Sequence, residues 1–222
     1  MLQSSSSTVD KYLEAIFYID AEGDVVRPGH LASWLAVSPP TVTEALGRLR
    51  RDGWIRVEAN RSVLLTEAGH SRATNLVRRH RILERWLTDV LGLDWASADE
   101  EAGGLSSAIS DRLIDRIDES LQLPLTCPHG NVIPGRRVPY GELHRLSDVP
   151  PGVIATVRRI SEVAEHEARE LLALLATARI AEGSPMRMLA SEVRDRIAVD
   201  VGGTPVTLSL DAAKLIWVEF ED

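Results

Sequence analysis

Residues 38–66 read SPPTVTEALGRLRRDGWIRVEANRSVLLT, and this stretch decides the fold. A serine N-cap at Ser38 with proline in the first helical turn predicts that a helix begins at Pro39. Apolar residues at helical spacing predict its buried face: Val42, Ala45, Leu46 and Leu49. Gly53 is expected to end this helix. The apolar segments 54–57 and 63–65 then predict a β-hairpin around residues 59–62.

Two helices are expected upstream of this stretch. Apolar spacing predicts the first over about residues 9–17, with Thr8 as its N-cap. Pro28 suits the first turn of a short second helix that carries Leu31 and Leu35. Three helices followed by a hairpin form a winged helix-turn-helix. In that motif one helix enters the major groove of DNA and the wing reaches the flanking backbone.

Downstream, the pattern predicts two further units. A long helix is expected over about 67–91, and another helical stretch over about 95–121 with an interruption at Gly103-Gly104. Residues 124–139 read as an irregular connector. Short strands at 153–160, 197–201, 205–209 and 216–220, with a helix at 167–175, are typical of a small SH3-like barrel. We expect an α+β protein with a winged helix-turn-helix domain (1–66), a helical dimerisation domain (67–140) and an SH3-like β-barrel domain (148–222).

The charge distribution bears on DNA binding, although the chain is acidic overall with a formal net charge of -8. Residues 27–81 hold ten arginines and four acidic residues, a local balance of +6. Screening limits electrostatic reach to about 10 Å at 0.1 M salt, so the local sign decides whether phosphate is attracted. A solvated arginine-rich surface would have the same composition, so charge alone leaves both interpretations open.

Composition and missing motifs narrow the class of protein. A single cysteine, Cys127, rules out an intramolecular disulfide framework and fits a reducing cytoplasm. We expect no membrane span and no signal peptide. There is no Ser-His-Asp spacing, Gly-rich phosphate loop or paired zinc-type cysteines, so we do not expect an enzyme. Cys127-Pro128 is too short a signal for haem, which we do not expect, and with His129 it is assigned to the connector.

At this point the sequence resembles the diphtheria-toxin-repressor family of metal-dependent regulators, over nearly its whole length. The motifs are weak singly and specific in their order and spacing. They are Tyr12-Leu13 with Ile16, SPPTVT at 38–43, Arg51-Asp52-Gly53, LTEAG at 65–69, Arg79-His80-Arg81, Ser110-Asp111 and PHGNVIPG at 128–135. The resemblance implies a cytoplasmic homodimer with a FeoA-like last domain. It also implies a repressor of metal homeostasis that binds a pseudo-palindromic double-stranded DNA operator when a divalent metal is loaded.

The resemblance also implies which residues read DNA. Thr41, Thr43 and Glu44 match positions that face base edges, where a threonine methyl packs on thymine and a glutamate accepts from cytosine. Glu44 departs from the glutamine of the family member compared, so we expect a shifted operator preference. The expected contacts are completed by Ser38 and Pro40 and by the phosphate-binding Arg48, Arg51 and Arg61. A merely solvated surface is the alternative.

For metal, the resemblance implies a site built from His80, Glu84, Asp99, Glu162 and Glu165. His80 and Glu84 are about one helical turn apart, so both leave the same helix face. One imidazole with up to four carboxylates suits Mn²⁺ or Fe²⁺, one ion per subunit. The alternative is a core histidine satisfied by Glu84, because leucines flank His80 along the helix.

The second family site is degenerate. Its positions correspond to Lys11, Gly103, Ser106 and Ser107, which are poor ligands or none, while Glu14 survives. One hypothesis is that the Lys11 ammonium replaces the missing cation. The alternative is an exposed Lys11–Glu14 pair. Three functions therefore stay open: a regulator responsive to Mn²⁺ or Fe²⁺, a metal-independent regulator of the same fold, and a small-molecule or redox sensor.

Overall fold

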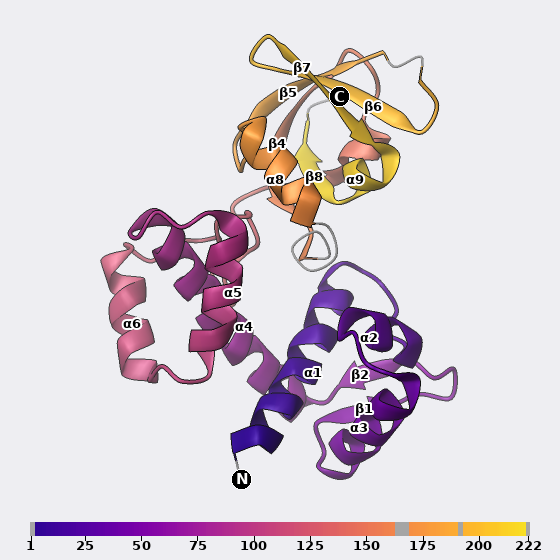
Figure 1. Cartoon of the computed structure of the whole chain (residues 1–222), viewed down its shortest axis with the longest axis vertical. Coiled ribbons are helices and arrows are strands. Elements are labelled where there is room, and N and C mark those ends of the chain that lie inside the picture. The colour runs from indigo at the N-terminus through magenta and orange to yellow at the C-terminus, as the bar shows by residue number, and fades with distance from the viewer. Residues whose placement is uncertain (1–2, 163–168, 191–192, 221–222) are drawn as a thin grey trace.

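The computed structural model describes residues 3–162, 169–190 and 193–220, which form three blocks (Figure 1). The DNA-binding block contains α1 (Gln3–Ala21), α2 (Pro28–Trp34), α3 (Pro39–Arg51), β1 (Ile55–Val57) and β2 (Val63–Leu65). The helical block contains α4 (Glu67–Asp89), α5 (Trp95–Ser106) and α6 (Asp111–Ser120). The SH3-like block holds the remaining strands. No helix within the described ranges has the length and apolar character needed to cross a membrane.

The DNA-binding block forms as the sequence predicts from residue 28 onward. The Ser38 side chain caps α3 by accepting a hydrogen bond from the Thr41 amide, and β1 pairs antiparallel with β2. α1 and α3 share one core that includes Leu13, Ile16 and Leu49. The prediction for the start of α1 was wrong: the helix begins at Gln3, so Thr8 is not its N-cap. Serine has only a modestly lower helix propensity than straight-chain residues, so the serine run is helical.

The helical block differs from the prediction at its break. α5 runs through Gly103-Gly104 and ends at Ser106. The chain turns over residues 107–110, and the Ser110 side chain then caps α6. A glycine inside a helix costs about 1 kcal/mol relative to alanine, and packing of α5 on α4 tolerates that cost. The break lies instead where serine and aspartate favour a new helix start.

The SH3-like block is a six-stranded antiparallel sheet of order β3-β8-β4-β5-β6-β7 with α8 (Arg169–Thr177) and α9 (Leu210–Lys214) packed at its core. The strands are β3 (His144–Arg145), β4 (Ile154–Ile160), β5 (Pro185–Leu189), β6 (Arg196–Val201), β7 (Thr204–Ser209) and β8 (Ile216–Glu219). The sequence did not predict β3, β5 or α9. A short 3-10 turn, Leu146–Asp148, follows β3.

A β-bulge in β4 decides which of its side chains leave the sheet core. The register against β8 shifts between Val157 and Arg159. As a result Val157 and Ile160, three residues apart, are both buried in the core. In a regular strand Arg159 would share the face of Val157. The bulge turns Arg159 outward instead, toward the other two blocks.

Candidate metal centre

The connector between the helical and SH3-like blocks contains a tight turn over residues 127–130. The Gly130 amide donates to the Cys127 carbonyl (3.0 Å), and Pro128 occupies the second position of the turn. Proline there and glycine at the end are the usual residues of a type I turn. We call residues 127–131 the ligand loop. All five of its residues are buried.

The ligand loop is fixed against β4 by backbone contacts. The Ile160 amide donates to the His129 carbonyl (2.8 Å), and the Asn131 side chain donates to the Ile160 carbonyl (2.9 Å). Gly130 has φ +82°, and a Cβ built on it would lie 1.9 Å from the Arg158 carbonyl oxygen. Only glycine therefore fits where the loop meets the bulge.

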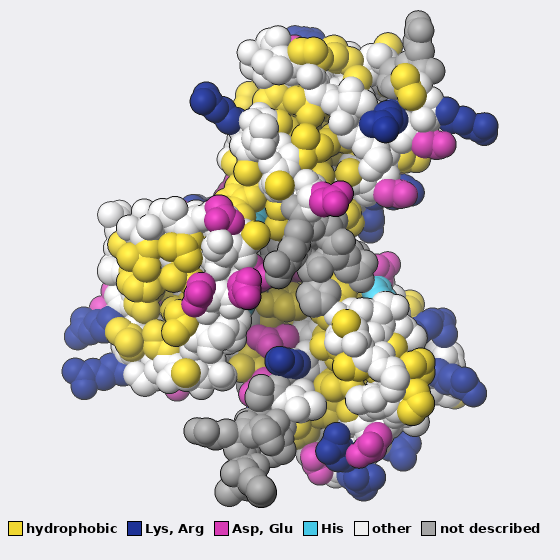
Figure 2. All heavy atoms as spheres, viewed as in Figure 1, with side chains coloured by type: hydrophobic (Ala, Val, Ile, Leu, Met, Phe, Trp, Pro, Cys, Tyr) yellow, Lys and Arg dark blue, Asp and Glu magenta, His cyan; other side chains and the backbone are white. Residues whose placement is uncertain are grey.

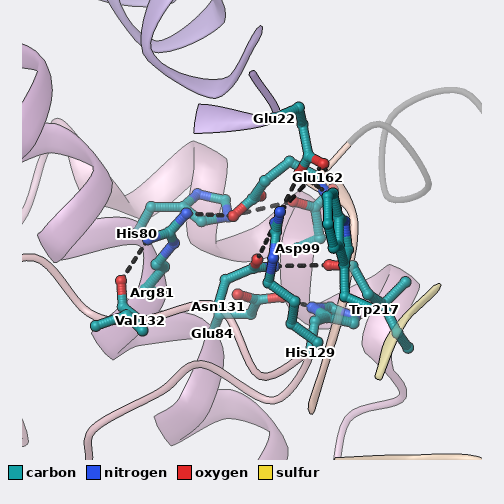
Figure 3. A network of polar contacts seen from close by, with 12 residues as sticks. Glu22, His80, Arg81, Glu84, Asp99, His129, Asn131, Val132, Glu162 and Trp217 are labelled. Carbon is teal, nitrogen blue, oxygen red and sulfur yellow. Dashed lines mark hydrogen bonds and ion pairs between the residues drawn. The ribbon is translucent and has the colours of Figure 1, made fainter. Parts of the chain in front are cut away.

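Three side chains that commonly bind metals meet at this loop. Ligand atoms of Glu84, Cys127 and His129 all lie within 4.8 Å of one another, and all three residues are buried. Glu84 comes from α4, and its Oε1 lies 2.7 Å from His129 Nδ1 (Figure 3). The imidazole also packs edge-on against Trp95, with ring centroids 4.9 Å apart. A cysteine sulfur, an imidazole and a carboxylate therefore converge at a buried site.

The polar chemistry of this cluster fits a cation. Glu84 is 1 % exposed, and its Oε2 has no hydrogen-bond partner among the described residues. Burying a carboxylate oxygen without a partner is costly, and a bound divalent ion would remove that cost. Cys, His and Glu are the usual protein ligands of borderline transition metals.

Among the four predicted metal ligands that the structure describes, no three have ligand atoms that meet at one point. His80 Nε2 lies 3.2 Å from Asp99 Oδ1, which joins α4 to α5. Glu84 instead contacts His129. Glu162 accepts a hydrogen bond from Arg81, a buried residue of α4 (Figure 3). Glu165 lies outside the described residues.

A cavity of about 410 Å³ lies between α1, α2, α4 and α5, bordered by Glu14, His80, Asp99 and Glu162. Burial raises the pKa of Glu14 to about 6, opposed by the charge of His80. Burial alone would lower the pKa of His80, but its hydrogen bond to Asp99 and the surrounding carboxylates raise it to about 9. Near neutral pH, His80 is therefore an imidazolium among carboxylates.

The degenerate family site is divided between two cavities. Lys11, Glu14 and Gly103 border the first. Ser106 and Ser107 border a second cavity, beside Arg79. The Ser106 hydroxyl donates to the Gly103 carbonyl (3.3 Å). These five positions therefore do not line a single cavity in the described structure.

The predicted DNA-reading residues lie on the surface of α3 and the wing. Every one of them is exposed: Ser38, Pro40, Thr41, Thr43, Glu44, Arg48, Arg51 and Arg61. The Thr43 hydroxyl donates to the Pro39 carbonyl (3.0 Å), so its methyl group and its oxygen as an acceptor remain available to contact DNA. Figure 2 shows Lys and Arg side chains gathered at the lower end of this block, where α3 lies in Figure 1.

Sequence reasoning missed Cys127 and His129, which it assigned to the connector. A signal was present. Cys-Pro-His-Gly combines a type I turn signature with two common metal ligands two residues apart. Their proximity to Glu84 depends on how the connector folds back on α4, which no spacing reveals.

Comparisons with known proteins agree with this architecture. Three family models match: the iron dependent repressor N-terminal DNA binding domain at 5–63, the metal binding and dimerisation domain of the same repressors at 66–135, and the FeoA domain at 144–220. An iron-dependent repressor of Mycobacterium leprae is 30% identical over 96% of both chains. The diphtheria toxin repressor of Corynebacterium efficiens is 31% identical over 97% of this chain and 96% of its own.

A solved structure is also similar along its whole length. A manganese-dependent transcriptional repressor in complex with manganese superposes with a TM-score of 0.83 at 34% identity, covering 96% of this chain and 100% of that one. The expected family and fold class are thereby confirmed. The chain belongs to the family of iron-dependent repressors, DNA-binding transcriptional regulators that include the diphtheria toxin repressor.

Proposed function

We propose that this protein is a transcriptional repressor whose affinity for its operator is set by a divalent transition metal held by Glu84, Cys127 and His129. The observation that carries this proposal is the buried convergence of these three side chains, with one oxygen of Glu84 lacking a hydrogen-bond partner among the described residues. A bound cation would offset the charge of Glu84 and of a Cys127 thiolate, and would tie α4 to the ligand loop.

The donor set favours ferrous iron over manganese. A thiolate and an imidazole are softer ligands than the carboxylates of the five-residue site predicted from sequence. Similar proteins are named for either metal. We propose one ion per subunit at the ligand loop. The site of His80, Glu84, Asp99, Glu162 and Glu165 stays a prediction, and it would require Glu162 to exchange its contact with Arg81 for the metal.

DNA binding is assigned to α3 and the wing of a homodimer. Two copies are needed because a two-fold dimer reads the two halves of a pseudo-palindrome. Large apolar side chains are exposed on the helical block, including Leu105 (38%) and Leu113 (50%), and Figure 2 shows apolar side chains gathered on this block. A patch of that kind on a family dimerisation domain supports dimer formation there.

Loading the protein with Co²⁺ tests the metal site directly. Cobalt bound through a thiolate gives an intense near-ultraviolet charge-transfer band that carboxylate ligands do not give. We expect the band in the wild type at one ion per subunit and its loss in Cys127→Ser. A wild-type protein that binds Co²⁺ without this band would contradict the proposal.

A second candidate function is a regulator that no longer needs metal. The observation in its favour is that cationic side chains already contact or adjoin carboxylates that the resemblance implies for metal. The His80 imidazolium lies against Asp99, Arg81 against Glu162, and Lys11 borders the same cavity as Glu14. This candidate predicts that a strong chelator leaves operator affinity unchanged, whereas the first predicts a large loss.

A further inference from the structure

The carboxylate of Glu22, one residue beyond the end of α1, receives bonds only from the SH3-like block in the described contacts. Arg159 Nη1 lies 2.7 Å from Oε1 and Nη2 lies 3.3 Å from Oε2. The Trp217 indole donates to Oε2 (3.2 Å), and the Glu162 amide donates to Oε1 (3.3 Å). Figure 3 shows Glu22 reaching into this network. We call Glu22, Arg159 and Trp217 the latch.

The latch is buried and stacked. The side chains of Glu22 and Arg159 are 3% and 12% exposed. The guanidinium of Arg159 also lies over the Trp217 ring, 4.7 Å from its centroid. A buried carboxylate that loses its partner is strongly destabilised, so the two blocks are held in the pose that keeps the pair intact. The β4 bulge is what turns Arg159 toward Glu22.

The latch also contacts the ligand loop. Arg159 Nη1 donates to Asn131 Oδ1 (3.1 Å), and Asn131 holds the carbonyl of Ile160. On the other side of the loop, Arg85 of α4 donates to the Cys127 carbonyl (3.2 Å). A loop clamped by a metal to Glu84 would therefore place Asn131, and with it Arg159, against Glu22.

The position of α1 determines the position of the recognition helix. Leu13, Ile16 and Ile19 of α1 lie in one core with Val42 and Leu49 of α3. A close-packed core moves as a unit. Fixing the end of α1 therefore fixes the pose of α3, and a dimer binds two half-sites best when both recognition helices are held at the right spacing.

We propose that the latch couples metal occupancy at the ligand loop to operator binding, with Glu22 as the positioning residue of the DNA-binding block. This inference rests on the proposed function for its metal dependence. Its structural part, that Glu22 holds α1 and α3 in the DNA-binding pose, stands apart from the identity of the metal.

The test compares Glu22→Gln and Arg159→Gln with the matched control Arg158→Gln. Arg158 is the neighbouring residue of β4 and forms its ion pair with Glu219 (2.6 Å) inside the SH3-like block, so it does not join blocks. Trp217→Phe is a milder variant, because it removes one hydrogen bond of the latch and keeps an aromatic ring under Arg159. Operator affinity is measured for the dimer with Co²⁺ and with chelator, using an operator selected from random DNA. Co²⁺ affinity and thermal unfolding are measured on the same samples.

We expect Glu22→Gln and Arg159→Gln to weaken operator binding in Co²⁺ by about tenfold and to remove most of the gain caused by the metal. Co²⁺ affinity should stay within about threefold, because neither residue is a ligand. The double variant, Glu22→Gln with Arg159→Gln, should bind operator no more weakly than either single variant. Trp217→Phe should lose less operator affinity, and Arg158→Gln should bind operator as the wild type does.

The latch is overturned if a folded Glu22→Gln protein keeps the wild-type operator affinity and the wild-type gain in affinity on adding metal. If Glu22→Gln does not fold, the same result in both Trp217→Phe and Arg159→Gln overturns it. Tighter binding in these variants, or an equal loss in Arg158→Gln, would overturn it as well. If metal leaves wild-type operator binding unchanged, the proposed function fails. The latch is then judged by the loss of affinity in chelator alone.

Discussion

The cavity beside α1 and the cluster at the ligand loop draw on His80 and Glu84, two residues one turn apart on the same face of α4, and they differ in the charges that border them. The cavity is bordered by Lys11 and by the His80 imidazolium, which already stand among its carboxylates. The cluster of Glu84, Cys127 and His129 is closed, holds three ligand types and leaves a carboxylate oxygen without a hydrogen-bond partner in the described structure. This comparison favours the ligand-loop cluster as the proposed metal site, one helical turn along α4 from the cavity.

The largest expected effect is on metal affinity, which should fall with substitutions in the ligand-loop cluster and not with a substitution in the cavity. Glu84→Gln and His129→Ala should lower Co²⁺ affinity by about 100-fold or more, because losing a ligand weakens metal binding more than losing a residue that only supports a ligand. Glu14→Gln in the cavity should stay within about threefold of the wild type. Competition with a chromogenic chelator measures all three. An equal loss in His80→Ala would place the ion in the site predicted from sequence instead.

The next effect concerns the close packing of the ligand loop. Gly130→Ala should reduce the free energy of unfolding by roughly 3 kcal/mol, because the new methyl group meets the Arg158 carbonyl and the φ is positive. Gly135→Ala is the matched control in the same connector: it has a similar φ of +86° and open space around the Cβ, so about 1 kcal/mol is expected. Urea unfolding gives both values, and equal losses would show that the clash contributes nothing.

A smaller effect is expected in the cavity. If metal acts at the ligand loop, Lys11→Met should change operator affinity in Co²⁺ by less than about threefold. The reason is that an exposed charge such as Lys11 near Glu14 contributes little free energy. Fluorescence anisotropy with labelled operator measures the change. A large loss that persists in chelator would favour the metal-independent candidate, in which Lys11 replaces a cation.

The smallest effect lies inside the SH3-like block. The Gly141 amide and Arg158 hold the pKa of Glu219 below its usual value of 4.5. A lowered pKa adds stability above the unfolded value, and that stability is lost as the pH falls through the folded value. Glu219→Gln should therefore be less stable than the wild type at pH 7, with the difference shrinking toward pH 3. Urea midpoints at both pH values measure it, and a difference that persists at pH 3 would contradict this assignment.

The sequence predicted what depends on local signals. Ser38, Pro39 and Gly53 mark α3 and the wing because caps, prolines and glycines act within one turn of the chain. The start of α1 was misplaced because serine disfavours a helix only modestly, and the break near α5 because packing of α5 on α4 tolerates Gly103-Gly104. Within the metal region, His80 and Glu84 were found as a helical pair. The contact of Glu84 with His129, the pairing of Arg81 with Glu162 and the latch at Glu22 join residues far apart in sequence, so only the folded chain reveals them.

The most direct test of the central claim is a titration of operator binding with Fe²⁺ under anaerobic conditions, for the wild type and Cys127→Ser. We predict that wild-type affinity rises strongly as one ion per subunit is added, and that Cys127→Ser keeps the affinity of the chelated wild type at the same metal concentrations. A Cys127→Ser protein that responds to metal as the wild type does would show that the switch lies outside the ligand loop.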